Sequence, residues 1–190
     1  MTIRGRALLS GGLALVGALS AAGSASALTL GQVAPPNLGN CSSCDGFQLK
    51  VGAGAPKYRV PAGSTGLWTI NSWSAQGGGS ANGRARLRVY RRTPTGGQFK
   101  LVKQSDLKTV PKDGSPSFAT SLNVKQGDML GLGTVSSLPL AYGTAFTGSD
   151  VKILFCDPTG VGQLVGAGTM CPLADYQDGL VNVAATLTPR

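Results

Sequence analysis

The sequence contains no histidine and no glutamate, and these two absences limit the chemistry that the chain can perform. All eight of its acidic residues are aspartates. Histidine is the commonest general base, the usual activator of a serine or cysteine nucleophile, and the commonest metal ligand. Most hydrolase mechanisms are therefore disfavoured, and we assign no catalytic residue, no metal and no cofactor.

Long apolar runs are also scarce, and the one that opens the chain is short and rich in glycine for a membrane-spanning helix. Two arginines precede this apolar segment, 7–23, and the small residues 25–27 follow it. This order is typical of a secretory signal peptide. We predict a signal peptide over residues 1–27, a secreted, extracellular product, and no membrane insertion after cleavage.

The composition of the remaining residues, 28–190, favours a single domain built from strands. Their number is enough for one domain with a sizeable core. The chain holds 29 glycines and 11 prolines, only 13% of its residues are charged, and no long segment has helical periodicity. These features indicate many short strands joined by turns.

The clearest strand signal is segment 84–91, where apolar residues alternate with arginines. Turn residues at 93–97 and an apolar stretch at 99–103 predict the returning strand of a hairpin. Alternation or short apolar runs predict further strands at 47–51, 58–60, 67–75, 118–124, 129–132, 151–155 and 181–187. This spacing of short strands indicates an all-β, antiparallel β-sandwich of either jelly-roll or immunoglobulin-like topology.

Three short motifs carry a resemblance to other proteins. They are Ser72-Trp73-Ser74, the sequence VKQGDMLG at 124–131 and the sequence VNVAATLTP at 181–189. In this order they resemble a set of secreted bacterial β-sandwich proteins that have no assigned activity. The resemblance implies the same fold and the same export, and it brings no site residue with it.

Four cysteines, Cys41, Cys44, Cys156 and Cys171, form the even set that is typical of structural disulfides in an exported chain. The spacing of Cys41 and Cys44 would also suit zinc, but Cys156 and Cys171 lie too far apart to form the matching ligand pair. We predict that all four are oxidised. Local pairing, Cys41–Cys44 with Cys156–Cys171, is favoured over cross-links that would tie the N-terminal segment to the later loop.

The predicted loop 156–179 is long and holds three aspartates, Asp157, Asp175 and Asp178. Calcium takes six to eight oxygen ligands, typically from closely spaced carboxylates, and the loop lacks that pattern. Sites on β-sandwiches usually lie in such loops. A secreted enzyme with a histidine-independent mechanism would have its site here, and this is the alternative to a binding role.

Arg84, Arg86 and Arg88 are predicted to form a row of cations about 7 Å apart on a solvated strand face. With a net charge of +9, such a row suits an anionic polymer of the cell envelope. A solvated face that discourages edge pairing explains the same pattern. Nucleic acid is disfavoured, because no aromatic residue interrupts the row. More cations lie on or near the same hairpin, namely Arg91, Arg92, Lys100 and Lys103.

Trp68 and Trp73 are five residues apart, so on a regular strand they face opposite sides of the sheet. We assign Trp73 to the core and expect Trp68 to be exposed, where it could stack against a sugar ring. A β-bulge or a covering loop would bury both. The sequence therefore predicts a secreted, non-catalytic binding or surface-structural module for an anionic polymer or a glycan, with Trp68 and the arginine row as candidate ligand-binding residues.

Overall fold

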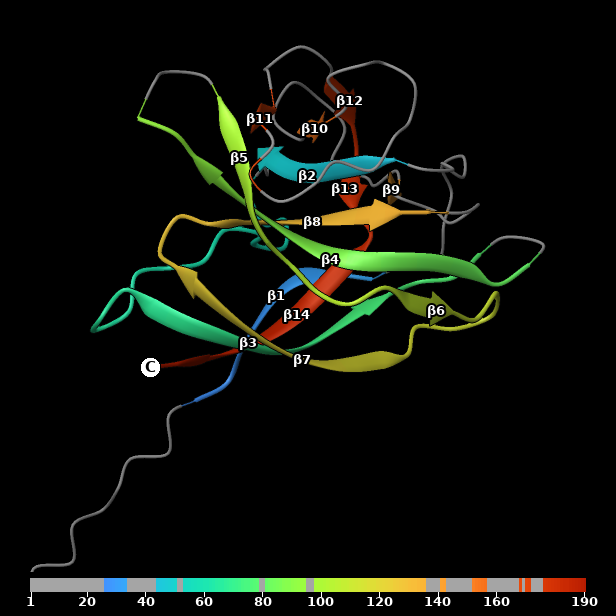
Figure 1. Cartoon of the computed structure of the whole chain (residues 1–190), viewed down its shortest axis with the longest axis horizontal. Helices are drawn as coiled ribbons and strands as arrows, with labels where there is room; N and C mark the ends of the chain where they lie inside the picture. The colour runs from blue at the N-terminus through green and yellow to red at the C-terminus, as the bar shows by residue number, and fades with distance from the viewer. Residues whose placement is uncertain are drawn as a thin grey trace, which may run out of the picture.

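All the regular elements that we can describe are β-strands. The computed structural model describes residues 26–33, 44–50, 53–78, 81–94, 98–135, 141–142, 152–156, 168, 170–171 and 176–190. Over these residues antiparallel sheets form two layers (Figure 1). This confirms the predicted all-β class and is consistent with a β-sandwich. The predicted signal peptide lies, except for its last two residues, outside the described residues, which include no helix that could cross a membrane.

The smaller sheet has four strands in the order β1-β14-β3-β7. Their bounds are β1 Leu28–Gln32, β14 Val183–Pro189, β3 Leu67–Ala75 and β7 Ser117–Lys125. Buried residues alternate with half-buried ones along most of β14, and half-buried residues alternate with exposed ones along most of β7, as a sheet with one face on a core requires. Strand β7 comes last in the strand order and therefore forms one edge of this layer.

The larger sheet has the order β11-β5-β4-β8-β2-β10-β12, with β6 paired to β4. Its strands are β2 Asp45–Lys50, β4 Gly83–Arg92, β5 Phe99–Gln104, β6 Lys108–Val110, β8 Met129–Thr134, β10 Lys152–Phe155, β11 Met170–Cys171 and β12 Tyr176–Asp178. Two short strands, β9 Ala141–Tyr142 and β13 Leu180–Val181, pair with each other in a separate two-stranded sheet. The antiparallel pairing of β4 with β5 confirms the predicted hairpin.

The main core lies between the two layers and takes alternate side chains from both. Ile70 and Trp73 come from the smaller sheet, and Leu87 and Leu132 from the larger one; all are at most 1% exposed. The burial of Leu87 and Leu132 follows the period of two along their strands, whereas Ile70 and Trp73, three residues apart, face the same core because β3 is irregular around Asn71. The layers are therefore joined by apolar packing of the kind that the sequence pattern predicts.

A second apolar cluster covers the opposite face of the larger sheet. It contains Phe47, Tyr90, Phe99, Leu101, Met129, Leu154, Cys156 and Cys171. Cys156 directly follows β10, near one end of the strand order, whereas Cys171 belongs to β11 at the other end, and the two form a disulfide. The sheet therefore curls until its ends meet, and β10 and β11 come together above β2 in Figure 1.

The disulfide between Cys156 and Cys171 confirms the predicted local pairing of these two residues. Cys44 is disulfide-bonded as well. Cys41, its predicted partner, lies outside the described residues. Disulfides persist mainly in oxidising compartments outside the cytoplasm, which agrees with the expectation that the protein is exported.

Candidate functional site

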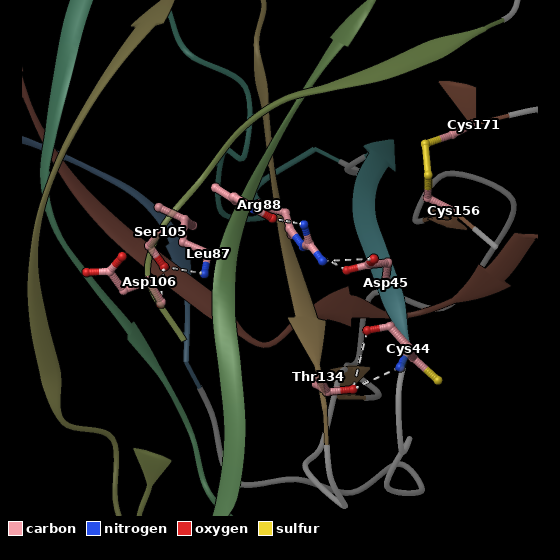
Figure 2. Close-up of polar contacts among 10 residues, drawn as sticks. Cys44, Asp45, Leu87, Arg88, Ser105, Asp106, Thr134, Cys156 and Cys171 are labelled. Carbon is pink, nitrogen blue, oxygen red and sulfur yellow. Dashed lines mark hydrogen bonds and ion pairs between the residues drawn. A yellow bond between two sulfur atoms is a disulfide. The ribbon is translucent and has the colours of Figure 1, made fainter. Parts of the chain in front are cut away.

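Arg88 is buried, and the expectation that it lies on a solvated face is wrong. Its side chain is 1% exposed, and its Nε and Nη2 donate to Asp45 Oδ1 and Oδ2 at 2.9 and 3.2 Å. Figure 2 shows the two side chains directed toward each other. Arg88 Nη1 also donates to Gln104 Oε1. Beside this pair, Thr134 Oγ1 accepts a hydrogen bond from the Cys44 backbone N–H at 3.2 Å. The cation therefore stabilises the interior.

Two glycines in β8 make room for this arrangement. A Cβ at Gly133 would overlap the Asp45 carboxylate and lie 2.6 Å from Arg88 Nε. A Cβ at Gly131 would lie 2.8 Å from both Phe47 Cβ and the Tyr90 ring. That gap admits the Phe47–Tyr90 stack, with ring centroids 4.4 Å apart. The curled sheet thus encloses its outer face, which is why alternation with buried residues does not expose Arg88.

The other two arginines of the predicted row reach solvent to different extents. Arg84 is exposed, and Arg86 is half-buried with an Nε that has no hydrogen-bond partner. Burial lowers the pKa of Arg86, and the neighbouring positive charge of Arg88 lowers it further. The structure therefore does not present the row as three solvated cations.

Trp68 is 8% exposed, so the expectation of an exposed tryptophan is wrong. Its indole N–H donates to the Pro61 carbonyl at 3.2 Å. Around Asn71 the register of β3 shifts against both neighbouring strands, and this bulge turns Trp68 and Trp73 toward the same core. A platform for stacking a sugar ring is therefore absent at Trp68.

The structure gathers cations in a different place, at the β4–β5 hairpin. A groove of about 510 Å³ lies there, and we call it the hairpin groove. Arg92 and Lys100 line it and are exposed. The rest of its lining is Arg91, Thr93, Pro94, Leu101, Val102 and Gly168. Two exposed cations thus share one open concave surface.

Arg91 holds the base of this groove in place. Its Nε and Nη2 donate to Asp128 Oδ1 and Oδ2 at 2.7 and 2.8 Å, a bidentate pair. The Asp128 side chain is 0% exposed and also accepts the Lys125 backbone N–H at 2.9 Å. The hydrogen bond to Asp128 raises the pKa of Arg91. The hairpin is therefore anchored to the β7–β8 turn.

A second groove, of about 490 Å³, lies where β2 separates from β8, and we call it the fork groove. Strand β2 pairs with β8 only as far as Phe47 while its pairing with β10 continues to Lys50, and segment 58–60 then takes its place beside β8. The backbone N–H of Leu130 donates to the Tyr58 carbonyl at 2.9 Å. The groove lining includes the exposed cations Lys50, Lys57 and Arg59.

Both grooves border the end of the larger sheet at which β4 finishes and β8 begins. Tyr90 pairs with Met129 across these strands, and Met129 bridges to Arg59. We define the basic end by five of the exposed cations that line or adjoin the grooves: Lys57, Arg59, Arg92, Lys100 and Lys125.

The described aspartates do not neutralise this basic end. Asp45 and Asp128 are buried in ion pairs with arginines. Asp106 and Asp113 are exposed, and neither lines a groove. Among the aspartates whose side chains are described, none therefore offers a countercharge within either groove.

The alternative enzyme site falls on the predicted loop 156–179. Asp157 and Asp175 lie outside the described residues, as does the side chain of Asp178. Among the residues that the structure describes, no three potential metal ligands of the histidine, cysteine or carboxylate type come together. No protein-family model, curated protein or solved structure matches the chain.

The sequence pointed to some of the basic end but not to all of it. Arg92 and Lys100 fall on the hairpin that the alternation predicts. Lys57 and Arg59 were missed, although their alternation with Tyr58 and Val60, two buried residues, was a usable signal. Segment 57–60 lies at the surface because β2 and β8 separate beside it. That separation depends on pairing between distant strands, which a single sequence does not show.

Proposed function

We propose that the chain is a secreted, non-catalytic binding module that holds an anionic polymer, such as an acidic polymer of the cell envelope, at its basic end. The observation that carries the proposal is the separation of charge. Two of the four described aspartate side chains, Asp45 and Asp128, are buried and form ion pairs with Arg88 and Arg91. The cations of the basic end keep their charge at the surface, beside two grooves.

A polymer fits this geometry better than a single small anion. Arg91 lines the hairpin groove, and Gly127 and Met129, the neighbours of its partner Asp128, line the fork groove, so a polymer that spans both would contact cations in each. Exposed ion pairs contribute little individually. Linked contacts add through effective concentration, so a repeating anion gains affinity that one anion would lack.

Export is part of the proposal and rests on two features. The first residues have the order of a signal peptide. The Cys156–Cys171 disulfide belongs to a class of bond that persists mainly in oxidising, extracytoplasmic compartments. An acidic envelope polymer is a partner that a secreted module would meet.

The experiment compares dextran sulfate with uncharged dextran of equal length. We expect binding of the sulfated polymer alone, weakening steeply as salt rises, because added ions screen exposed charges. The double variants Arg92→Ser/Lys100→Ser and Lys57→Ser/Arg59→Ser should each reduce the affinity several-fold.

The matched control removes the same charge outside the groove linings, in the variant Lys103→Ser/Lys112→Ser, since both lysines are exposed and line neither groove. The control should bind more tightly than either groove variant. Equal losses in all three variants would mean that only net charge matters. Equal binding of uncharged dextran would replace the anionic site with a neutral glycan site.

A further inference from the structure

Among the described residues, strand β7 has an open edge. It is nine residues long and ends the strand order of the smaller sheet. In the part of the chain that the structure describes, it pairs with β3 alone. Alternate residues of an edge strand direct their backbone N–H and C=O groups away from the sheet, where they can pair with another strand.

Two of the usual protections of an edge strand, charge and proline, are missing from β7, although its register against β3 shifts at Thr120 and Ser121. Natural edges carry charges, prolines or bulges that prevent pairing with other chains. From Ser117 to Val124 the strand has no charge and no proline, and Lys125 is its last residue. Lys125 is also the sole charged residue in the four strands of the smaller sheet.

The inward side chains of β7 are incompletely covered. Phe118 packs on Trp73 with ring centroids 4.8 Å apart, yet Phe118 remains half-buried, as does Leu122. Val124, at the end of the strand, is buried. A further strand beside β7 would remove apolar surface of Phe118 and Leu122 from water.

We propose that β7 pairs antiparallel with β7 of a second copy of this chain, across a two-fold axis at Ser121. Centring the axis there pairs all nine residues. Phe118 then lies opposite Val124, and Lys125 lies opposite Ser117.

Residues that pair across this axis are an even number of positions apart in the sequence. Their side chains therefore lie on the same face of the joined sheet. No like charges meet in this register, and the two smaller sheets become one continuous sheet whose strands carry a charge on the outer face only at Lys125. A C2 interface is self-complementary, as one strand pairing with itself requires.

The first test is the mass of the full chain in solution as a function of concentration, by sedimentation equilibrium. We expect a monomer–dimer equilibrium for the parent. Ser121→Lys should abolish the dimer, because two lysines would face each other at the axis while Ser121 is exposed and tolerates the change. Thr29→Lys adds the same charge at β1, on the opposite edge of the same sheet, and should leave the dimer intact.

The second test fixes the register by cross-linking. Ser121→Cys should give a disulfide-linked dimer on mild oxidation. Ser117→Cys should not, because in this register its two copies lie about 26 Å apart along the strands. A parent that is monomeric at all concentrations, a dimer that survives Ser121→Lys, or equal cross-linking of both cysteine variants would overturn the proposal.

Discussion

Replacing Arg88 by methionine should strongly destabilise the protein. Methionine keeps an unbranched side chain but removes the guanidinium that binds Asp45 inside the curled sheet. Both side chains of the pair are at most 1% exposed, so the carboxylate would lose its cation without gaining water. Breaking a buried pair in this way costs about 3–5 kcal/mol. Since domains are stable by about 5–15 kcal/mol, a large share of the folding free energy would be lost.

Urea unfolding followed by circular dichroism measures this loss. With a slope of about 1–3 kcal/mol per molar urea, the midpoint should fall by at least about 1 M. Arg92→Met is the matched control, because Arg92 lies on the same strand but is exposed, and it should shift the free energy of unfolding by about 0.5 kcal/mol or less.

A double variant separates the lost pair from a general packing defect. Arg88→Met/Asp45→Leu removes both charges, and replacing a whole buried pair by apolar groups is often neutral. We therefore expect the double variant to be more stable than Arg88→Met alone. If Arg88→Met matches Arg92→Met in stability, Arg88 is a solvated cation and the reasoning from burial fails.

Three further predictions concern the second cluster and the ion pair inside the curled sheet. Tyr90→Phe should leave stability unchanged or higher at neutral pH, because the Tyr90 hydroxyl is buried without a hydrogen-bond partner. Burial raises the Tyr90 pKa, so the parent should lose stability as pH rises above about 10, where only the unfolded tyrosine ionises, and urea midpoints should show the variant losing less. Cys156→Ser/Cys171→Ser should lower the free energy of unfolding by about 3 kcal/mol, because the disulfide joins residues 15 positions apart. An unchanged melting temperature would contradict the view that this disulfide holds the curled sheet closed. Gly133→Ala should cost about 1–3 kcal/mol by crowding the ion pair, measured as a lower urea midpoint; a neutral result would refute the close packing.

Alternation in the sequence predicts strands well where one face is buried. The segment 67–75 coincides with β3, and 84–91 and 118–124 each lie inside a longer observed strand. Those patterns report a period of two, which is local. Strand β1 and the short β11 and β12 were not predicted, because pairing with distant strands holds them in the sheets.

The face assignment of Arg88 could not be made from the same pattern. Alternation separates two faces of a strand but does not tell whether the second face meets water. Here the Cys156–Cys171 disulfide closes the sheet over that face. The alternating glycines Gly131 and Gly133 were the available signal of close packing, since glycine within a strand often marks a close approach of neighbouring groups.

The position of Trp68 shows the same limit. A separation of five residues puts two side chains on opposite faces only if the strand is regular. The bulge at Asn71 adds one residue and reverses the parity, so Trp68 joins Trp73 in the core. Bulges depend on pairing with neighbouring strands and leave no reliable mark in one sequence.

The most direct test of the basic end is an NMR titration of the isotope-labelled protein with dextran sulfate at low salt. We expect the largest amide shifts at Lys57, Arg59, Arg92 and Lys100, and we expect added salt to reverse them. The same titration with uncharged dextran should leave these signals unmoved. Shifts that centre on Arg84 instead, or no shifts at low salt, would contradict the proposal that the two grooves bind an anionic polymer.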